Sequence, residues 1–256
     1  MSLSSSIIVS GNTLGEVWLN SMEAVCAEGV QAVRPLVALI ENFDTEQEPV
    51  DSLSIRSTVD ADLSKRSGVP SVETTARLIF PRSYWNPGKP RVEFYARFQK
   101  NFPRIKRASR KNNYGTYFHR LISYPGAPCG GNQLEFIIDL YANKKVSRET
   151  ALQAAVFYPN KDLTAQRQRG FPCLQQVMFS VTDQQRLAVT GVYARQYIDD
   201  RGYGNYLGLC WLGRFMAHEM GLALEKVCCI ATSGGLGGTK ARGRKLVTRC
   251  RALSPG

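Results

Sequence analysis

Residues 170–224 read GFPCLQQVMFSVTDQQRLAVTGVYARQYIDDRGYGNYLGLCWLGRFMAHEMGLAL, and this stretch decides the fold. Cys173 follows a proline, two apolar segments come after it, and Arg195 stands shortly after a tyrosine. Asn205 then opens a long apolar segment that is typical of a buried helix. The order of these residues predicts that a thiol and a phosphate-binding cation face one pocket.

The same stretch and the residues after it set the fold class. Val177–Val181 and Leu187–Tyr193 predict two strands joined by a tight turn at Thr182–Arg186. Tyr206–Leu224 predicts a long helix, and the β-branched Val227–Thr232 predicts a buried strand. Because strands and helices do not alternate regularly, we expect an α+β fold with one large mixed sheet and flanking helices.

Two capping signals predict helices further upstream. Thr13 and Glu16 form a capping box before an apolar helical face, and Gly29 is a natural end for that helix. Asn132 and Glu135 repeat the pattern before a second helix.

Other segments of this half predict strands or loops. Thr74–Phe80 and Val92–Phe98 are expected to be extended, with prolines in the turns between them. Ala151–Tyr158 is expected to be a short buried strand. The polar residues 43–52 and 57–71 are expected to be loops.

Length and composition favour a single domain. The chain has 256 residues and 43% apolar content, enough for a sizeable core. We expect one domain over residues 1–238, followed by a basic C-terminal tail over 239–256. No apolar run approaches the roughly 18 residues of a membrane span, and the first residues do not resemble a secretory signal. These features predict a cytoplasmic protein without a membrane partner.

The cysteines argue against a disulfide framework or a structural metal site. The chain has seven cysteines, no CxxC pair and only two histidines, His119 and His218. We therefore expect reduced thiols, structural histidines and no metal.

The charge predicts a polyanionic partner. The net charge is +12, and two segments, 100–111 and 240–251, each contain six Lys or Arg residues. Such segments are expected to bind nucleotide phosphate, nucleic acid or an acidic protein, although solvated surface is the simpler interpretation.

The order of several short motifs resembles the thymidylate synthase family. The motifs are Pro172-Cys173-Leu174, Tyr193-Ala194-Arg195-Gln196 and Asn205, with Tyr114-Gly115 upstream. The resemblance covers roughly residues 110–238, and it rests on order and spacing rather than on one motif. It implies a thymidylate synthase-like fold, and a homodimer in which the sheets of two chains pack face to face.

The resemblance also implies a reaction and roles for individual residues. The Cys173 thiolate would add to C6 of a pyrimidine nucleotide, and C5 would then take a one-carbon unit from a reduced folate, 5,10-methylenetetrahydrofolate. Arg195 matches the arginine that binds the nucleotide phosphate, and Asn205 matches the asparagine that binds the uracil edge. Tyr114 matches a tyrosine that orders proton transfer at C5.

Two further residues are weaker candidates from the same resemblance. Glu93 matches a glutamate that holds a structural water. Arg148 is the candidate for an arginine that reaches across the dimer to the nucleotide.

The sequence also departs from the family pattern. Leu174 replaces the histidine after the cysteine, and Asp199 and Asp200 are displaced from the position of the aspartate that contacts folate. Gly235 and Gly237 stand where the family has the histidine and tyrosine that hold the sugar hydroxyl. These departures indicate a ribonucleotide or another unusual substrate.

Three functions remain open at this stage. The first is a C5 methyl- or hydroxymethyltransferase acting on a pyrimidine nucleotide. The second is a nucleotide-binding or sensor subunit on the same scaffold that has lost the folate contacts. The third is direct binding of nucleic acid through the two basic segments.

Overall fold

A mixed sheet forms the centre of the protein. The structure is a computed structural model that describes residues 6–143, 148–165 and 172–253. Among these residues, six strands form one sheet in the order β1-β2-β7-β5-β4-β3. They are β1 (Ile7–Val9), β2 (Leu36–Ile40), β3 (Gln153–Ala155), β4 (Leu174–Val181), β5 (Arg186–Tyr193) and β7 (Ala223–Ala231). β1 runs parallel to β2 and β5 runs parallel to β7, whereas the other neighbours are antiparallel.

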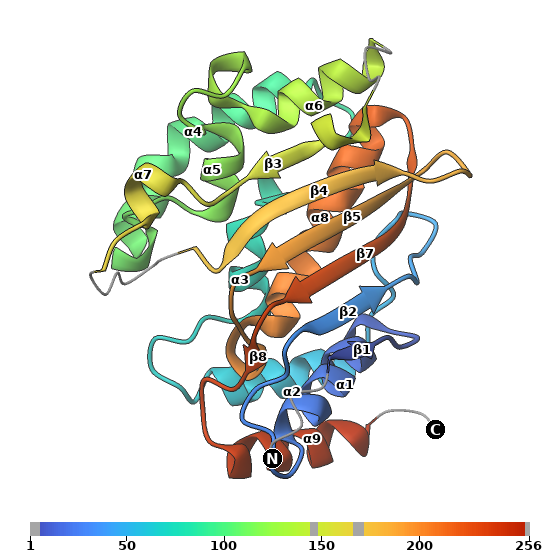
Figure 1. Ribbon diagram of the computed structural model, residues 1–256, viewed down its shortest axis with the longest axis vertical. Helices are drawn as coiled ribbons and strands as arrows, with labels where there is room; N and C mark the ends of the chain where they lie inside the picture. Colours follow the sequence, from blue (N-terminus) through green and yellow to red (C-terminus); the bar gives the residue numbers. More distant parts are fainter. Residues whose placement is uncertain (1–5, 144–147, 166–171, 254–256) are drawn as a thin grey trace.

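Helices cover one face of this sheet, as Figure 1 shows. α8 (Tyr203–Met220) packs on β5 and β7, and α1 (Leu14–Cys26) packs on β2. The other helices are α2 (Leu53–Leu63), α3 (Val72–Ile79), α4 (Arg91–Ala108), α5 (Tyr117–Ile122), α6 (Gln133–Ala142), α7 (Pro159–Asp162) and α9 (Lys240–Arg251). The expected α+β class, with one large mixed sheet flanked by helices, is confirmed.

Several local predictions from the sequence are confirmed. Thr13 accepts a hydrogen bond from the Glu16 amide at 3.1 Å and caps α1, although Glu16 reaches back to Asn12 rather than to Thr13. Asn132 caps α6 by accepting from the Glu135 amide at 3.1 Å. The hairpin of β4 and β5 turns where expected, since the Thr182 amide donates to Arg186 O at 2.8 Å.

Other local predictions are wrong, and the apolar spacing explains why. Thr74–Phe80 and Val92–Phe98 are not extended: they lie mostly in α3 and α4. In α4, Phe94, Phe98 and Phe102 recur every four residues and lie against the core, which is a helical period rather than a strand period. Residues 57–63, expected as a loop, belong to α2.

The C-terminal segment is structured as well. Residues 240–251, expected within a basic tail, form α9, which packs against α1 and α2. Leu246 and Cys250 are buried at this contact. The segment therefore carries part of the hydrophobic core.

Close backbone contacts hold the start of α8 against α3 and the sheet. A Cβ atom at Gly204 would lie 2.5 Å from Thr75 Cβ, and one at Gly191 would lie 2.7 Å from a methyl carbon of Leu209. Such distances require glycine, because real Cβ atoms do not approach neighbours so closely. The glycines therefore bring the first turn of α8 beside α3 and beside the end of β5.

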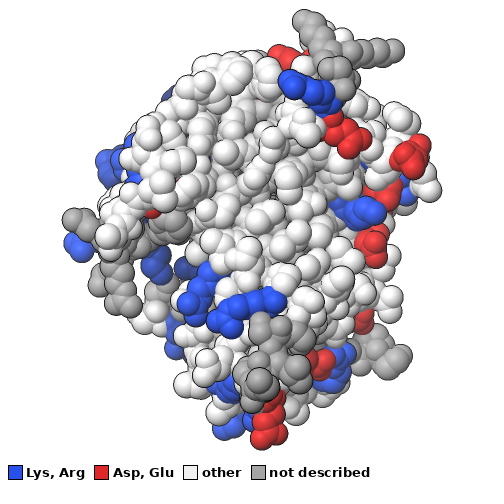
Figure 2. All heavy atoms as spheres, viewed as in Figure 1, with Lys and Arg blue, Asp and Glu red and all other residues white. Residues whose placement is uncertain are grey.

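The second face of the sheet carries a band of partly exposed apolar side chains. Val37, Ile230 and Val192 are register neighbours across β2, β7 and β5, and Leu39 is paired with Cys228 in the next row. Figure 2 shows that the upper and middle parts of this face are largely uncharged, whereas a group of Lys and Arg side chains lies across its lower part. Most of the face thus combines low charge with partly exposed apolar area.

Candidate functional site

A cavity of about 570 Å³ lies at one end of the sheet, where β4 begins and β5 ends. It is bounded by the start of α3, the end of α4, the segment before α5, and the first turn of α8. Three of the residues that the sequence singles out, Cys173, Arg195 and Asn205, line this cavity. The structure therefore brings together three side chains that are 22 and 10 positions apart along the chain.

Cys173 provides the thiol of the cavity. It precedes β4, and its carbonyl accepts a hydrogen bond of 2.9 Å from the Ala194 amide, which fixes the start of β4 next to the end of β5. Burial raises the pKa of the Cys173 thiol, and the guanidinium groups of Arg201 and Arg195 oppose this rise. The thiol is thus held mainly protonated near neutral pH, with two cations that favour the thiolate.

Arg195 is exposed at the mouth of the cavity. Its guanidinium carbon lies 4.9 Å from the centre of the Tyr197 ring, over which it stacks. No carboxylate among the described residues forms an ion pair with it. A planar guanidinium held in this way can bind a phosphate through two parallel hydrogen bonds.

Arg201 is the second guanidinium, and the sequence analysis missed it. It belongs to the short π-helical turn η5 (Ile198–Gly202) and lies 3.5 Å from the Thr75 hydroxyl oxygen. Burial lowers the pKa of Arg201, while the nearby Tyr117, Asp200 and Cys173 side chains raise it. Its position directly before the apolar helix is the signal in the sequence that points to it.

Asn205 supplies a carboxamide at the base of the cavity. It is the third residue of α8 and is only 4% exposed. Asn205 does not cap α8, because Gly202 occupies the capping position. No described group forms a side-chain hydrogen bond with it, so the carboxamide is available to a ligand as both donor and acceptor.

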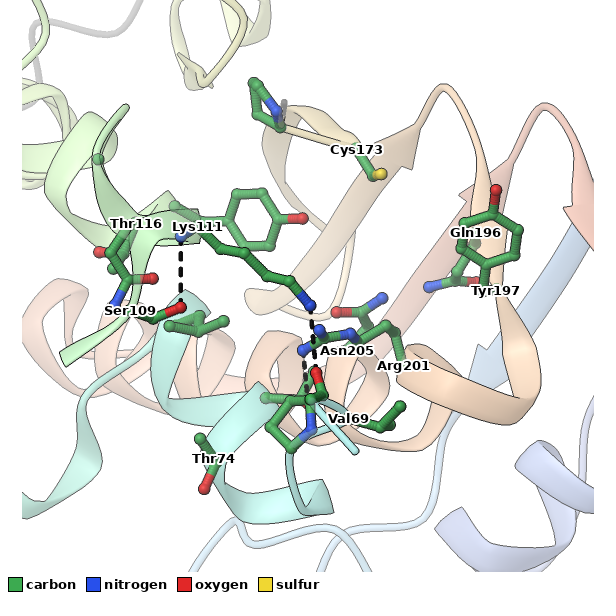
Figure 3. A pocket seen from close by; sticks show the side chains of 18 of the residues that line it. Val69, Thr74, Ser109, Lys111, Thr116, Cys173, Gln196, Tyr197, Arg201 and Asn205 are labelled. Atoms are coloured by element: carbon green, nitrogen blue, oxygen red, sulfur yellow. Dashed lines mark hydrogen bonds between the residues drawn. The ribbon is translucent and has the colours of Figure 1, made fainter. Parts of the chain in front are cut away.

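Two other lining residues complete the site. The Lys111 ammonium donates to Gly68 O at 3.1 Å, and burial followed by repulsion from Arg201 lowers the pKa of Lys111. Tyr117 hydrogen-bonds to the backbone of Cys173 and Leu174, and burial raises its pKa. In Figure 3, the ends of Lys111, Arg201 and Asn205 lie together, across the cavity from the Cys173 sulfur.

Three predicted site residues lie elsewhere. Tyr114 does not line the cavity and is 43% exposed, whereas Tyr117 lines it. Glu93 is exposed in the first turn of α4, and Arg148 is exposed before β3. Neither lines the cavity.

The two aspartates before Arg201 point away from the cavity. Asp199 accepts hydrogen bonds from the Gly237 and Gly238 amides at 2.7 and 3.0 Å and pairs with Arg242 at 3.3 Å. Asp200 pairs with Arg66, and burial raises the pKa of Asp200. A Cβ at Gly237 would lie against the Asp200 carboxylate, so the backbone approaches this side chain closely.

The cavity is consequently rich in positive charge. Lys111, Arg195 and Arg201 line it, and none of the described lining residues is Asp or Glu. Within the described residues, no group of three or more His, Cys, Asp or Glu side chains is arranged to hold a metal ion. Among the described helices, none has the length and apolar character that crossing a bilayer requires.

The chain matches no protein-family model and no curated protein. The resemblance to thymidylate synthases therefore rests on the order of motifs alone, and it stays a prediction. What the structure itself provides is a cationic cavity with one thiol and one unpaired carboxamide.

Proposed function

We propose that the cavity binds a pyrimidine nucleotide and that Cys173 adds reversibly to the pyrimidine ring. One observation supports this proposal most strongly: the thiol of Cys173, the guanidinium groups of Arg195 and Arg201, and the carboxamide of Asn205 line the same cavity. The thiol can act as a nucleophile, the guanidinium groups can bind an anion, and the carboxamide can hydrogen-bond to the edge of a heterocyclic base.

Each group has a distinct role in this proposal. Arg195 and Arg201 bind the phosphate, since both guanidinium groups belong to residues that line the cavity. Asn205 pairs with the edge of the base, where one ring nitrogen donates and one carbonyl accepts. Val69, Pro70 and Leu78 provide an apolar wall for the face of the ring.

The covalent step balances without another reactant. The Cys173 thiolate forms a bond to C6, the C5–C6 double bond breaks, and its electron pair moves onto the carbonyl oxygen at C4. C5 then takes a proton from solvent. Reversal can remove the original hydrogen from C5, expel the thiolate and leave a solvent hydrogen in its place.

The described residues do not fit a reduced folate well. Asp199 is bound to backbone amides and to Arg242, and no carboxylate of the described residues lines the cavity to pair with a pterin ring. Transfer of a one-carbon unit from a folate therefore stays an expectation of the resemblance, and no step is derived through it.

Nucleotide binding is tested by thermal unfolding with uridine and cytidine monophosphates, in the ribose and deoxyribose forms. A hundredfold excess over the Kd stabilises the folded state by about 2.7 kcal/mol, which raises Tm by several degrees. Arg195→Ala should remove most of this shift, whereas Arg249→Ala, an exposed change in α9, should preserve it. The proposal is wrong if none of the monophosphates stabilises the protein.

The covalent step is tested by release of tritium from nucleotides labelled at C5. The wild-type protein should release tritium to water without added folate, and Cys173→Ala should abolish the release. Cys228→Ala, on the sheet face, is the matched control and should retain it. Equal release from the Cys173→Ala protein would exclude the proposed adduct.

A sensor without turnover is the second candidate function. Two observations favour it: burial raises the pKa of the Cys173 thiol, and none of the described residues that line the cavity has an acidic side chain that could act as a general base. A protein that is stabilised by nucleotides but releases no tritium would support this function over the first.

We also propose that two chains pair through the second face of the sheet. The register neighbours Val37, Ile230 and Val192 give this face a partly exposed apolar centre. Sedimentation should show a homodimer for the wild-type protein and a monomer for Val192→Lys. A wild-type monomer at high concentration would contradict this pairing.

A further inference from the structure

A row of cations runs along the exposed side of α4. We call it the α4 stripe, and it consists of Arg97, Lys100, Arg104 and Arg107. At 3.6 residues per turn, its members fall within about 80° of one another around the helix and span about 15 Å along it. Phe94 and Phe98 of the same helix are buried, whereas all four members of the stripe are exposed. The stripe is thus fully on the surface.

The cations of the stripe have no acidic partner in the part of the chain that the structure describes. Among the described residues, no carboxylate forms an ion pair with any of the four. Arg97 lies over the Tyr84 ring at 5.2 Å, and Arg107 donates only to Pro103 O of its own helix at 3.3 Å. Like charges three and four residues apart on a helix repel each other and destabilise it. An anion bound to the stripe would reduce this repulsion.

The stripe leads into the cavity. α4 ends at Ala108, and Ala108, Ser109, Lys111 and Asn112 all line the cavity wall. Figure 3 shows the ends of Lys111 and Arg201 together, and after burial the charge of Arg201 lowers the pKa of Lys111. Lys111 therefore lies between the end of the stripe and the guanidinium that is proposed to bind phosphate. The positive surface therefore continues from the outside of α4 to the interior of the site.

A mononucleotide is too small to use this surface. Its single phosphate lies inside the cavity near Arg195 and Arg201, and it cannot also reach cations spread over about 15 Å of helix. The additional cations require additional phosphates at a regular spacing. A polymer that supplies such phosphates and also presents a pyrimidine nucleotide is a polynucleotide.

The surroundings of the cavity favour a single strand. A base must leave a duplex stack before it enters a pocket, whereas a single strand offers it directly. Tyr114 is 43% exposed and Tyr197 is 36% exposed, and Arg195 stacks on the second ring. Such aromatic and guanidinium surfaces are typical of sites where neighbouring bases stack.

We infer that the α4 stripe binds the phosphates of a single-stranded polynucleotide and that one of its pyrimidines occupies the cavity. This inference rests on the proposed function, because it assigns the substrate of the same site. It changes the expected substrate from a free nucleotide to a nucleotide within a strand.

The test measures binding of fluorescent uridine and thymidine oligonucleotides by anisotropy at several salt concentrations. The stripe variant replaces its four cations with Gln. The matched control variant removes the same charge from exposed residues outside the cavity: Arg34, Lys89, Lys245 and Arg249. Binding of uridine monophosphate to both variants is followed by thermal shift.

The inference predicts that the stripe variant loses oligonucleotide affinity and that its salt dependence falls. Each lost phosphate contact lowers the slope of log K against log salt by about 0.7, so the slope should fall by up to about 3. The control variant should keep most of the slope. Both should still bind uridine monophosphate, and an excess of this nucleotide should compete with the oligonucleotide.

Several results would overturn the inference. Equal losses in the stripe and control variants would show a nonspecific charge effect, and equal affinity for a duplex would exclude the single-strand assignment. Equally strong competition by polyglutamate would indicate an acidic protein surface as the ligand. If uridine monophosphate binds but oligonucleotides bind no more tightly, only the inference fails; if no monophosphate binds, the proposed function fails as well.

Discussion

Segments 100–111 and 240–251 contain the same number of cations, yet the structure uses them differently. In α9, Arg242 pairs with Asp62 and Asp199, and Arg251 pairs with Glu23. Lys240 and Arg244 donate to backbone carbonyls at 2.8 and 3.0 Å. Within the described residues, no cation of segment 100–111 pairs with a carboxylate.

The difference shows that the charge of a segment does not reveal its role. α9 acts as part of the fold, because two of its cations, Arg242 and Arg251, pair with acids from α1, α2 and η5 that lie far away in sequence. Segment 100–111 keeps its charge unpaired and borders the cavity. The comparison therefore predicts that changes in α9 lower stability, whereas changes in the stripe lower binding.

The largest expected effect is on the packing of α9. Leu246→Ala should lower the free energy of unfolding by about 3 kcal/mol, because Leu246 is 1% exposed and its removal leaves a cavity. Val92→Ala in α4 is the control, since Val92 is 67% exposed, and it should change stability by less than about 0.5 kcal/mol. Chemical denaturation measures both. A harmless Leu246→Ala change would mean that α9 is not part of the core.

A somewhat smaller effect is expected for the ion pairs of α9. Arg242→Gln should cost about 2 kcal/mol, because Asp62 and Asp199 lose a cation while Asp199 stays buried with its two amide donors. Arg107→Gln in the stripe should leave stability within about 0.5 kcal/mol of the wild-type value. Similar losses in the two variants would remove the distinction between the segments.

The cations near α4 should also make stability depend on pH. His119 stacks on Phe102 with a centroid distance of 3.8 Å, and burial, followed by Arg120 and Lys106, lowers the pKa of His119 to about 4. The folded state thus disfavours the proton that the unfolded chain takes up below its ordinary pKa of about 6.5. Stability is therefore fully present above pH 6.5 and falls as pH drops towards 4.

Variants at the two histidines isolate this effect. His119→Phe keeps an aromatic ring against Phe102 and should reduce the loss of stability between pH 7 and pH 4.5. His218→Gln, at an exposed position, should show the same loss as the wild-type protein. An unchanged acid dependence in His119→Phe would assign the loss to other groups.

The smallest expected effect concerns the rate of thiol alkylation. Arg195→Gln removes a cation that favours the Cys173 thiolate, so its pKa should rise further and iodoacetamide should react about threefold more slowly at pH 8. Arg249→Gln in α9 should leave the rate unchanged. Peptide mapping of the modified Cys173 separates this reaction from that of the exposed Cys129.

Local signals in the sequence predicted part of the fold. Thr13 and Asn132 were recognisable as helix caps because each bonds an amide three residues ahead, and the β4–β5 hairpin followed from its alternation and turn. α3 and α4 were not predicted, because their apolar residues were interpreted with the period of a strand. Pro90 directly before α4 and Pro103 within it also obscured this helix in the sequence.

The candidate site was predicted in part for a similar reason. Cys173, Arg195 and Asn205 were identified by their order along the chain, and they do share a cavity. Lys111, Tyr117 and Arg201 were missed, because their relation to the thiol depends on how α3, α5 and α8 pack. The ion pairs of Asp199, which turn it from the cavity, join residues that no local pattern connects.

The central claim is that the cavity holds a pyrimidine nucleotide with its ring against the Cys173 sulfur. A crystal structure of the protein with saturating uridine monophosphate tests it most directly. We expect the phosphate within hydrogen-bonding distance of Arg195 or Arg201, the base edge on Asn205, and C6 facing the sulfur. A nucleotide bound outside the cavity, or one whose C6 points away from Cys173, would contradict the account.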